Sequence, residues 1–597
     1  MSILATAYSL EQFMVEAGAF APDLFLLLTL IAELMVTLFK TTAAPFPLEA
    51  RPVARRVMVY LLITAGWMLW GPTYNALAAS GTLFWVDAFQ LTTGLVTTKL
   101  ALIFFGLFVL AIADPYLKAH RANNYEFGIL VGLSLFAMFC VVSAYTLLVL
   151  YLSLELQALI FLILLSWHRQ SKWALEATLK YLLVNLLASL FFLLALTRCF
   201  AAVGSVAYDA IVNFYLPLAL NRWSASEGLA LLAMDYDLLA LVEFLTVADY
   251  TLAGYTAIVL ALSVSFAFKF GVAPFHLWVP TIYGSGSVPV IALLATASKI
   301  SYAAALSVLL GYVFYPVADV WQVFYLAVGL TSAWVGNVLL YREQGLLRLV
   351  GLSSIASGGY LYVVWAMAPS AYLYPLALMG TIISGLAYCN LFLVMSSTYV
   401  LRSDRVAQGV QTIPDLAHLR YSTGHGFLVA GLALSFASLA GIPPLLGFWS
   451  KLLTYGTFMF ALTTPSVGKI GLILSLMLSG VLGAVGYLRV IAALYFVDTV
   501  GFKSYAPIAR PLRWLNGVLM AITVGAFVVS FSSLPALAQW VGTFTLSATT
   551  PYVNHFFISV GTIVLFPSDY RSTFIVGCVL YLGGTKDYGC HATTIWT

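Results

Sequence analysis

The chain has 597 residues, of which 62% are hydrophobic and 8% charged, and its formal net charge is +4. Soluble proteins carry about 25% charged residues, so these few charges cannot cover a body of this size with a water-facing surface. A soluble enzyme, a nucleic-acid-binding protein with a basic patch and a disordered chain are therefore excluded. What remains is a polytopic membrane protein.

Long apolar runs predict an all-α polytopic membrane protein with about fourteen transmembrane helices. A membrane barrel would instead show strands of about ten residues with alternating polarity. The predicted spans are 21–40, 57–78, 94–113, 127–144, 146–166, 177–200, 251–270, 288–311, 321–341, 349–367, 370–399, 427–459, 468–496 and 514–534.

The basic residues of the connections support this count. Sixteen lysines and arginines fall in odd-numbered connections, against only Arg198, Arg222 and Lys469 in even-numbered ones. The positive-inside rule then places the odd connections in the cytoplasm or matrix and the N-terminus outside. A missed or additional span would scramble this contrast. The odd connection 271–287 is the weak point, because it carries only His276.

The spans group into four predicted regions. The first three spans occupy residues 1–126, spans 4–8 form a five-helix unit at 127–311, and spans 9–13 form a second unit at 312–496. Span 14 and a C-terminal extension take residues 497–597. The first unit also carries a mildly acidic insertion at 201–250, which we expect on the outer side.

Two spans contain strong helix breakers. Span 7 runs into FKFGVAPFHLW, with Pro274 shortly after Lys269, and span 12 contains AGIPPLLGFWSK, with Pro443 ahead of Lys451. Proline removes a backbone donor and clashes with the preceding turn, so helices 7 and 12 should be broken. Breaks at corresponding points of two halves indicate two inverted five-helix repeats, as in transporters. Two unrelated prolines that kink ordinary helices are the alternative.

Eight ionisable side chains lie inside the predicted spans. Each costs about 2.5–3.5 kcal/mol at a helix centre, and together on the order of 20 kcal/mol, so they must face one another or water. They are Glu33, Lys99, Glu155, Lys180, Lys269, Lys299, Lys451 and Arg489.

Four of the eight have ordinary structural interpretations. Lys99 lies near the start of its span and could extend to the membrane surface. Arg489 could pin a helix to a carbonyl, and Glu33 has no obvious partner. Lys180 follows Glu176 by one helical turn, and that pair alone could satisfy it. The other four have long apolar flanks and predict an ion or proton translocator, although an anion exchanger or sugar transporter stays open.

Five stretches around charged residues resemble the antiporter-like membrane subunits of respiratory complex I, most closely their subunit 2 (N-type) branch. The lysine in ATASKIS favours this branch over its siblings. Lys451 in GFWSK favours it over the subunit 4 branch; the subunit 5 branch shares GFWSK but would need a longer chain. The resemblance runs from about residue 21 to 534. The stretches are LLVLYLSLELQALIFLILLS around Glu155, LEATLKYLLVNLLASLFFL around Lys180, FAFKFGVAPFHLWVPTIY around Lys269, SVPVIALLATASKISYAAAL around Lys299 and LASLAGIPPLLGFWSKLLTY around Lys451.

The resemblance implies a proton relay made of buried side chains. Glu155 resembles the glutamate that pairs with the lysine of span 7, here Lys269. Lys299 resembles the central relay lysine, and Lys451 the terminal one near the outer exit.

Further positions follow from the same resemblance. Lys180 resembles an additional relay lysine, and His276 in the PFH-W pattern either assists a water chain or is structural. The chain departs from the family at one motif, which usually reads PDVYEGAPTPV. This chain reads PTIYGSGSVPV, so Thr281 and Gly284 replace the two acids, whose roles must be absent or supplied elsewhere.

The function that the resemblance implies is that of a proton-translocating, non-redox subunit of NADH:ubiquinone oxidoreductase. Its partners would be the other membrane-arm and peripheral subunits of complex I and membrane lipid, with no nucleic acid. We expect no cofactor or metal on this chain, because it shows no Rossmann glycine pattern, metal-ligand cluster or CxxC pair. The unusual tail and insertion favour the mitochondrial inner membrane, with the bacterial inner membrane as the alternative.

Two other functions stay open at this point. A cation/proton antiporter subunit of the same fold could act outside complex I. A structural membrane subunit could use its charges only to hold helices together.

Overall fold

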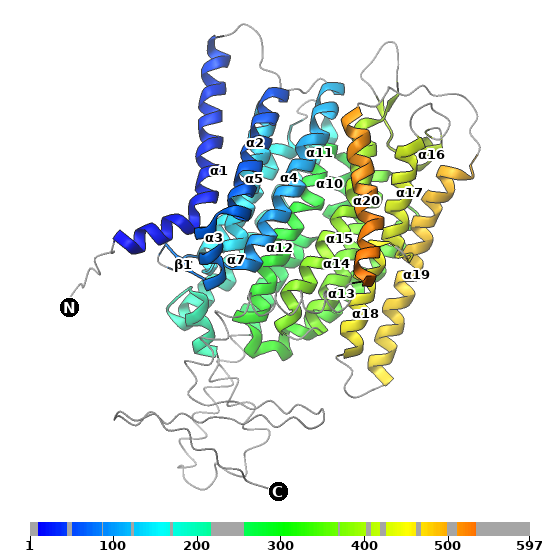
Figure 1. Cartoon of the computed structure of the whole chain (residues 1–597). Coiled ribbons are helices and arrows are strands. Elements are labelled where there is room, and N and C mark those ends of the chain that lie inside the picture. Colours follow the sequence, from blue (N-terminus) through cyan, green and yellow to red (C-terminus); the bar gives the residue numbers. More distant parts are fainter. Residues whose placement is uncertain are drawn as a thin grey trace, which may run out of the picture. The chain divides into compact units, whose positions relative to one another are not determined.

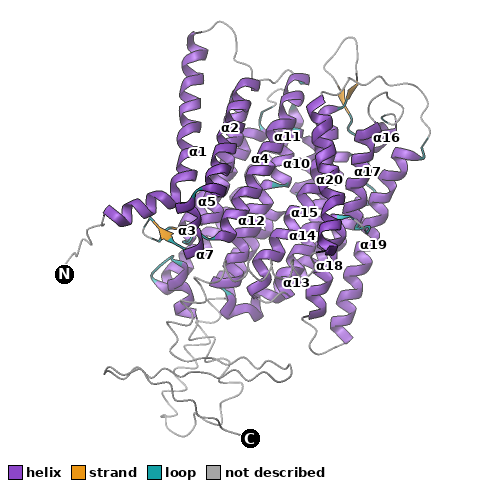
Figure 2. Ribbon diagram, viewed as in Figure 1, coloured by secondary structure: helices purple, strands orange, loops and turns teal. Residues whose placement is uncertain are grey.

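Helices make up nearly all the regular structure of the described residues, apart from two short β ribbons (Figure 2). The computed structural model describes residues 10–43, 50–85, 87–120, 124–167, 171–215, 256–367, 370–400, 408–417, 419, 426–443, 445–460, 467–497 and 510–532.

The first half of the chain holds helices up to the end of the predicted first unit (Figure 1). Its elements are α1 (Leu10–Ala43), α2 (Ala50–Trp70), α3 (Pro72–Ser80), β1 (Leu83–Phe84), β2 (Phe89–Gln90), α4 (Thr93–Ala119), α5 (Glu126–Ser143), α6 (Leu147–Leu165), α7 (Lys172–Val203), a helix at 208–215, a helix at Thr256–Phe270, α10 (Trp278–Ser285), α11 (Val288–Ala295), α12 (Ala297–Val308), a π-helical segment (Leu309–Val313) and a 3-10 turn (Tyr315–Val317).

The second half of the chain is also mostly helical. Its elements are α13 (Ala318–Leu340), α14 (Leu346–Met367), α15 (Ser370–Ser397), β3 (Tyr399–Val400), β4 (Gln408–Gly409), α16 (Ile413–Ala417), α17 (Gly426–Ala440), α18 (Leu446–Phe460), α19 (Val467–Tyr495) and α20 (Arg510–Ser532). Strands β1 and β2 pair antiparallel, as do β3 and β4.

The helices match the predicted spans closely. Eleven helices of the described residues are long and apolar enough to cross a membrane. The helix in predicted span 7 ends at Phe270, just before its break, predicted span 12 is divided into α17 and α18, and the 23-residue α20 occupies the position of span 14. The all-helical membrane fold is therefore confirmed, whereas the count of fourteen crossings and the boundaries of the four regions stay predictions. Most of the insertion (216–250) and the whole tail from 535 lie outside the described residues.

Two spans that the sequence predicts as continuous helices are each divided in the structure. The predicted span 57–78 ends early, because Gly71 leaves the helix and Pro72 starts α3 at a position where proline is favourable. The predicted span 288–311 is divided into α11 and α12 at Thr296, whose φ of −111° and ψ of −77° depart from ideal helix values. The Ala292 carbonyl accepts both the Thr296 hydroxyl, at 2.7 Å, and the Thr296 N–H, at 3.1 Å.

The odd connections meet at one end of the bundle. A cavity of about 1180 Å³ is lined there by side chains or backbone from five successive odd connections, including His120, Ser171, Gly284, Glu343 and Thr412. Because each of these connections follows two further predicted crossings, their convergence is what an up-and-down arrangement of helices requires.

The even connections meet one another in the same way. The hydroxyls of Tyr145 and Tyr312 each donate to Asp209 Oδ1 at 2.5 Å, which joins three even connections. The backbone N–H of Tyr145 donates to Ala88 of a fourth at 2.9 Å. Odd connections therefore contact other odd connections and even connections contact other even ones, as the distribution of basic residues predicts.

Helix α7 shows how a span divides its surface. Tyr181 and Ala188 are buried against the bundle, whereas Leu179 and Leu183 are each about 62% exposed and face outwards. Since the exposed face consists of leucines, it is suited to lipid or to a neighbouring membrane subunit. The face on which a residue of α7 lies decides what it can contact.

Candidate functional site

The first helix break lies directly beside Lys269. The helix Thr256–Phe270 stops at Gly271, whose φ of +69° favours glycine, and a cis peptide bond joins Ala273 to Pro274. The freed backbone is satisfied within the protein, because the Ala273 N–H donates to the Ser332 hydroxyl of α13 at 2.8 Å. The predicted break of span 7 is confirmed.

The second break holds Lys451 in a similar way. Helix α17 ends before Gly441, which has a φ of +81°, and α18 starts at Leu446. The Lys451 ammonium reaches back across the break and donates to the Ala440 carbonyl at 2.9 Å. A carbonyl at a helix C-terminus is a favourable partner for a cation. The predicted break of span 12 is confirmed, although Pro444 lies outside the described residues.

Lys299 sits beside the unexpected interruption at Thr296. It lies in the first turn of α12, and its ammonium donates to the Ser354 carbonyl of α14 at 3.1 Å. Lys269, Lys299 and Lys451 therefore each lie next to a local interruption of their helix. The third interruption carries no proline or glycine, so the breaker residues that revealed the other two could not reveal it.

Glu155 and Lys269 face each other but do not form a direct hydrogen bond. The Lys269 ammonium lies 4.0 Å from Glu155 Oε1, and its side chain is only 5% exposed. Asn185 of α7 lies between them: its Oδ1 accepts from the Lys269 ammonium at 3.2 Å, and its Nδ2 donates to Glu155 Oε2 at 3.3 Å. The expected pairing is present in geometry, and its third member was missed in the sequence.

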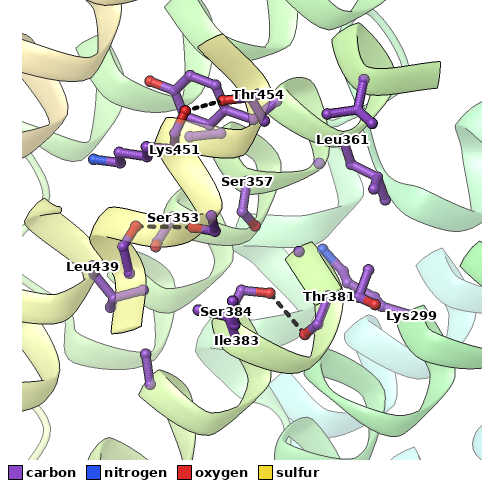
Figure 3. Close-up of a pocket in the computed structure, with 18 of the residues that line it drawn as sticks. Lys299, Ser353, Ser357, Leu361, Thr381, Ile383, Ser384, Leu439, Lys451 and Thr454 are labelled. Carbon is purple, nitrogen blue, oxygen red and sulfur yellow. Dashed lines mark hydrogen bonds between the residues drawn. The ribbon is translucent and has the colours of Figure 1, made fainter. Parts of the chain in front are cut away.

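A cavity of about 80 Å³ joins Lys299 to Lys451 (Figure 3). This volume has room for several water molecules, and its polar lining can hold them. In the view of Figure 3, Ser357 and Ser384 lie between the two lysines. The hydroxyl-bearing residues that line the cavity are Ser353, Ser357, Tyr360, Thr381, Ser384, Ser438, Ser450, Thr454 and Tyr487.

A smaller cavity of about 20 Å³ lies beside Lys269 and has room for one water molecule. It is lined by Asn185 and Tyr302, among others. Tyr302 follows Lys299 by one turn of α12, so its phenol lies on the same side of the helix as that lysine. Tyr302 is the group placed to connect the first lysine with the second.

Lys180 and His276 lie apart from this row. The Lys180 side chain is 42% exposed and pairs with Glu176 at 2.5 Å, the local pairing considered from the sequence. A rotation of about 100° per residue places Lys180 roughly 140° around α7 from Asn185, so the two cannot face the same partner. His276 is half-buried in the break that follows Lys269. A relay role for either residue stays a prediction.

The remaining intramembrane charges have structural partners. Lys99 does not extend to the surface, as one interpretation held; it pairs with Asp23 of α1 at 2.5 Å, and their side chains are 1% and 2% exposed. Glu33 accepts from Arg56 at 2.5 Å. Arg489 donates to the carbonyls of Tyr341 and Glu343, which confirms that it pins α19 to a connection.

Two of these partners were visible in the sequence. Asp23 lies in the first predicted span, and Asn185 is a lone amide in the apolar run LLVNLLASLFF. Because an unpartnered polar group inside a membrane is costly, each could have been flagged as needing a partner. Which partner each one finds depends on helix packing, and the sequence does not show it.

Solved structures that share this fold include chains of two different complexes. Respiratory complex I from Thermus thermophilus contains a chain that is 21% identical, with a TM-score of 0.64 over 86% of this chain and 98% of that one. The Mrp complex of a Dietzia species contains a chain that is 15% identical, with a TM-score of 0.68 over 89% of this chain and 97% of that one.

The sequence comparisons are more specific. NADH-quinone oxidoreductase subunit N 1 of Rhizobium meliloti is 29% identical over 85% of this chain and 94% of its own length. NADH-ubiquinone oxidoreductase chain 2 of Oenothera berteroana is 26% identical over 76% of this chain and 83% of its own length. The transmembrane model of the NADH:quinone oxidoreductase/Mrp antiporter family matches residues 144–478, which hold all three helix breaks and the predicted relay residues, and the chain belongs to this family.

Proposed function

We propose that this chain is a proton-translocating membrane subunit of an NADH:quinone oxidoreductase, corresponding to subunit N of bacteria and chain 2 of plant mitochondria. The observation that carries the proposal is the hydroxyl-lined cavity that contacts both Lys299 and Lys451. Two buried amines that share a cavity with room for water can exchange a proton without a cofactor on this chain. Redox chemistry would belong to partner subunits of the complex.

The proposed route starts at the Glu155–Lys269 pair. When the carboxylate and the ammonium separate from about 4 to about 8 Å at an effective dielectric of about 20, their attraction falls by about 2 kcal/mol. This free energy changes a proton occupancy by more than tenfold. The proton released from Lys269 would pass by Tyr302 to Lys299, and through the larger cavity to Lys451.

The test uses the assembled complex in sealed vesicles. Substitution Lys299→Ala should abolish the proton translocation that depends on this subunit, because the central carrier is lost. The matched control is Lys118→Ala, an exposed lysine paired with Asp114 at 3.1 Å at the end of α4. Normal proton translocation by the Lys299 variant, at normal levels of assembled complex, would refute the relay.

The proposed location is the inner membrane of a mitochondrion, with that of a bacterium as the alternative, since the relatives compared include both subunit N of bacteria and chain 2 of a plant. Fractionation of cells that express the tagged chain decides between the two.

The second candidate is a cation/proton antiporter subunit outside such a complex, which the similarity to a chain of the Mrp complex favours. Purification of the chain with its natural partners separates the two functions. Partners that carry flavin and iron–sulfur clusters support the oxidoreductase. Sodium-dependent proton exchange without such partners supports the antiporter.

A further inference from the structure

Asn185 forms a hydrogen bond with each member of the Glu155–Lys269 pair. The carboxylate and the ammonium each direct a hydrogen bond to its amide, at 3.3 and 3.2 Å, while their own closest approach is 4.0 Å. Glu155 Oε1, the oxygen nearest to the lysine, has no hydrogen-bond partner among the described residues. The pair is therefore held just outside hydrogen-bond distance.

An amide is suited to this position because it carries both a donor and an acceptor. Its oxygen offers the ammonium an alternative acceptor, and its nitrogen offers the carboxylate an alternative donor. The attraction between two opposite charges grows as they approach, so a direct salt bridge would hold the pair more strongly than two bonds to a neutral amide. The bridged pair is thus easier to separate than a direct salt bridge would be.

The backbone of α7 is fixed at the point where the amide acts. The Ser265 hydroxyl, one turn before Lys269, donates to the Ala188 carbonyl, about one turn after Asn185, at 2.7 Å. Tyr181, Asn185 and Ala188 follow a helical spacing of four and three residues and share the face of α7 that lines the cavity of Lys269. This contact fixes the backbone of α7 beside Lys269 and so keeps Asn185 next to the Glu155–Lys269 pair.

We propose that Asn185 is a positioning residue that keeps the Glu155–Lys269 pair ready to open, so that α7 takes part in controlling proton release from Lys269. This inference rests on the proposed function and adds to it a residue on a helix from which only Lys180 had been expected to contribute. Asn185 carries no proton itself; it sets the separation of the two groups that do.

The central variant is Asn185→Leu, which keeps the volume and removes both polar atoms. Without the bridge, carboxylate and ammonium should close into a direct salt bridge and hold the proton on Lys269. The expected result in vesicles of the assembled complex is a loss of protons translocated per quinone reduced. Asn185→Gln, which retains the amide, should restore part of that ratio.

The control is Asn390→Leu on α15, an asparagine that is fully buried and whose two amide atoms have no hydrogen-bond partner in the part of the chain that the structure describes. Its ratio of protons to quinone should equal that of the unmodified complex. An equal loss in the Asn390 variant would overturn the inference, because the ratio would then respond to any buried amide.

A variant that lacks the Glu155 carboxylate tests whether Asn185 acts through the Glu155–Lys269 pair. In Glu155→Gln complexes, adding Asn185→Leu should cause no further loss, because the bridge acts only through the pair. A further loss of the same size as in the unmodified background would contradict the inference. If Lys299→Ala abolishes translocation while Asn185→Leu leaves it intact, only the bridge is refuted; if Lys299→Ala also translocates normally, the relay itself is refuted.

Discussion

At the scale of single residues, the buried pair of Asp23 and Lys99 shows how this protein tolerates charge outside the relay. The two side chains contact each other at 2.5 Å and are almost fully shielded. A buried ion pair is often no more stabilising than an apolar pair of the same volume, but removal of one partner leaves an uncompensated charge. The pair joins α1 to α4, away from the three lysines of the proposed relay.

We therefore predict that Lys99→Met destabilises the subunit by about 3–5 kcal/mol, because Asp23 is left buried without a cation. The double variant Asp23→Leu, Lys99→Met should recover most of this loss. The measurement is the temperature at which the purified complex loses the subunit. The exposed Lys118→Met should change stability by about 1 kcal/mol at most. A double variant no more stable than the single one would show that the packing around these side chains, and not the charge, is decisive.

A second residue-scale prediction concerns Ser332, whose hydroxyl accepts from the Ala273 N–H at the first break. In Ser332→Ala this backbone donor remains buried without an acceptor, at a cost of about 1–3 kcal/mol. The same thermal measurement checks it. Ser475→Ala is a suitable comparison, because that hydroxyl only donates to a carbonyl of its own helix; equal stability of the two variants would contradict the prediction.

At the scale of helices, the breaks depend on glycines in a left-handed conformation. A Cβ at Gly271 would lie 2.2 Å from a methyl group of Val279, and the φ of +69° is itself unfavourable for alanine. Gly271→Ala should cost more than the about 1–2 kcal/mol of the left-handed conformation alone. Gly380→Ala in α15, where a Cβ meets nothing within 4 Å, should be neutral or slightly stabilising. The amount of assembled complex checks both; normal assembly of the Gly271 variant would refute the prediction.

Element boundaries show what the sequence could and could not predict. Apolar run length located the spans, and Pro274 and Pro443 located two of the breaks, because these signals act within a single helix. The interruption at Thr296 has no such signal, since a threonine inside a helix usually continues it. The half-exposed position of Lys180 was also beyond reach, because it depends on which face of α7 meets the helix Thr256–Phe270.

At the scale of the whole molecule, the alternation of the connections makes the orientation testable. Lys118 lies at the end where the odd connections meet, and Tyr315 in an even connection is 42% exposed. Single cysteines at these two positions should react with a membrane-impermeant maleimide from opposite sides of the membrane. Labelling of both from one side would refute the alternation, and labelling of the Lys118 position only from the outer side would refute the positive-inside orientation. The unmodified chain corrects for its native cysteines.

The pairing of distant residues was the part of the candidate site that the sequence could not supply. Glu155, Lys269, Lys299 and Lys451 could each be selected from depth in an apolar run and from the family resemblance. The bridge through Asn185 and the hydroxyls between Lys299 and Lys451 come from six or more helices that meet only after folding. Composition predicts that such charges need partners, and tertiary packing decides which ones they receive.

The two anchors of α1 differ in how much they respond to dissolved ions. Dissolved salt screens attraction between charges that ions can approach, and at 1 M the screening length is only about 3 Å. Arg56, which is 39% exposed, offers ions a route to its bond with Glu33, whereas the Asp23–Lys99 pair offers none. Washing with concentrated salt should thus loosen α1 from α2 while leaving it attached to α4, so the N-terminal helix would hinge before it detached.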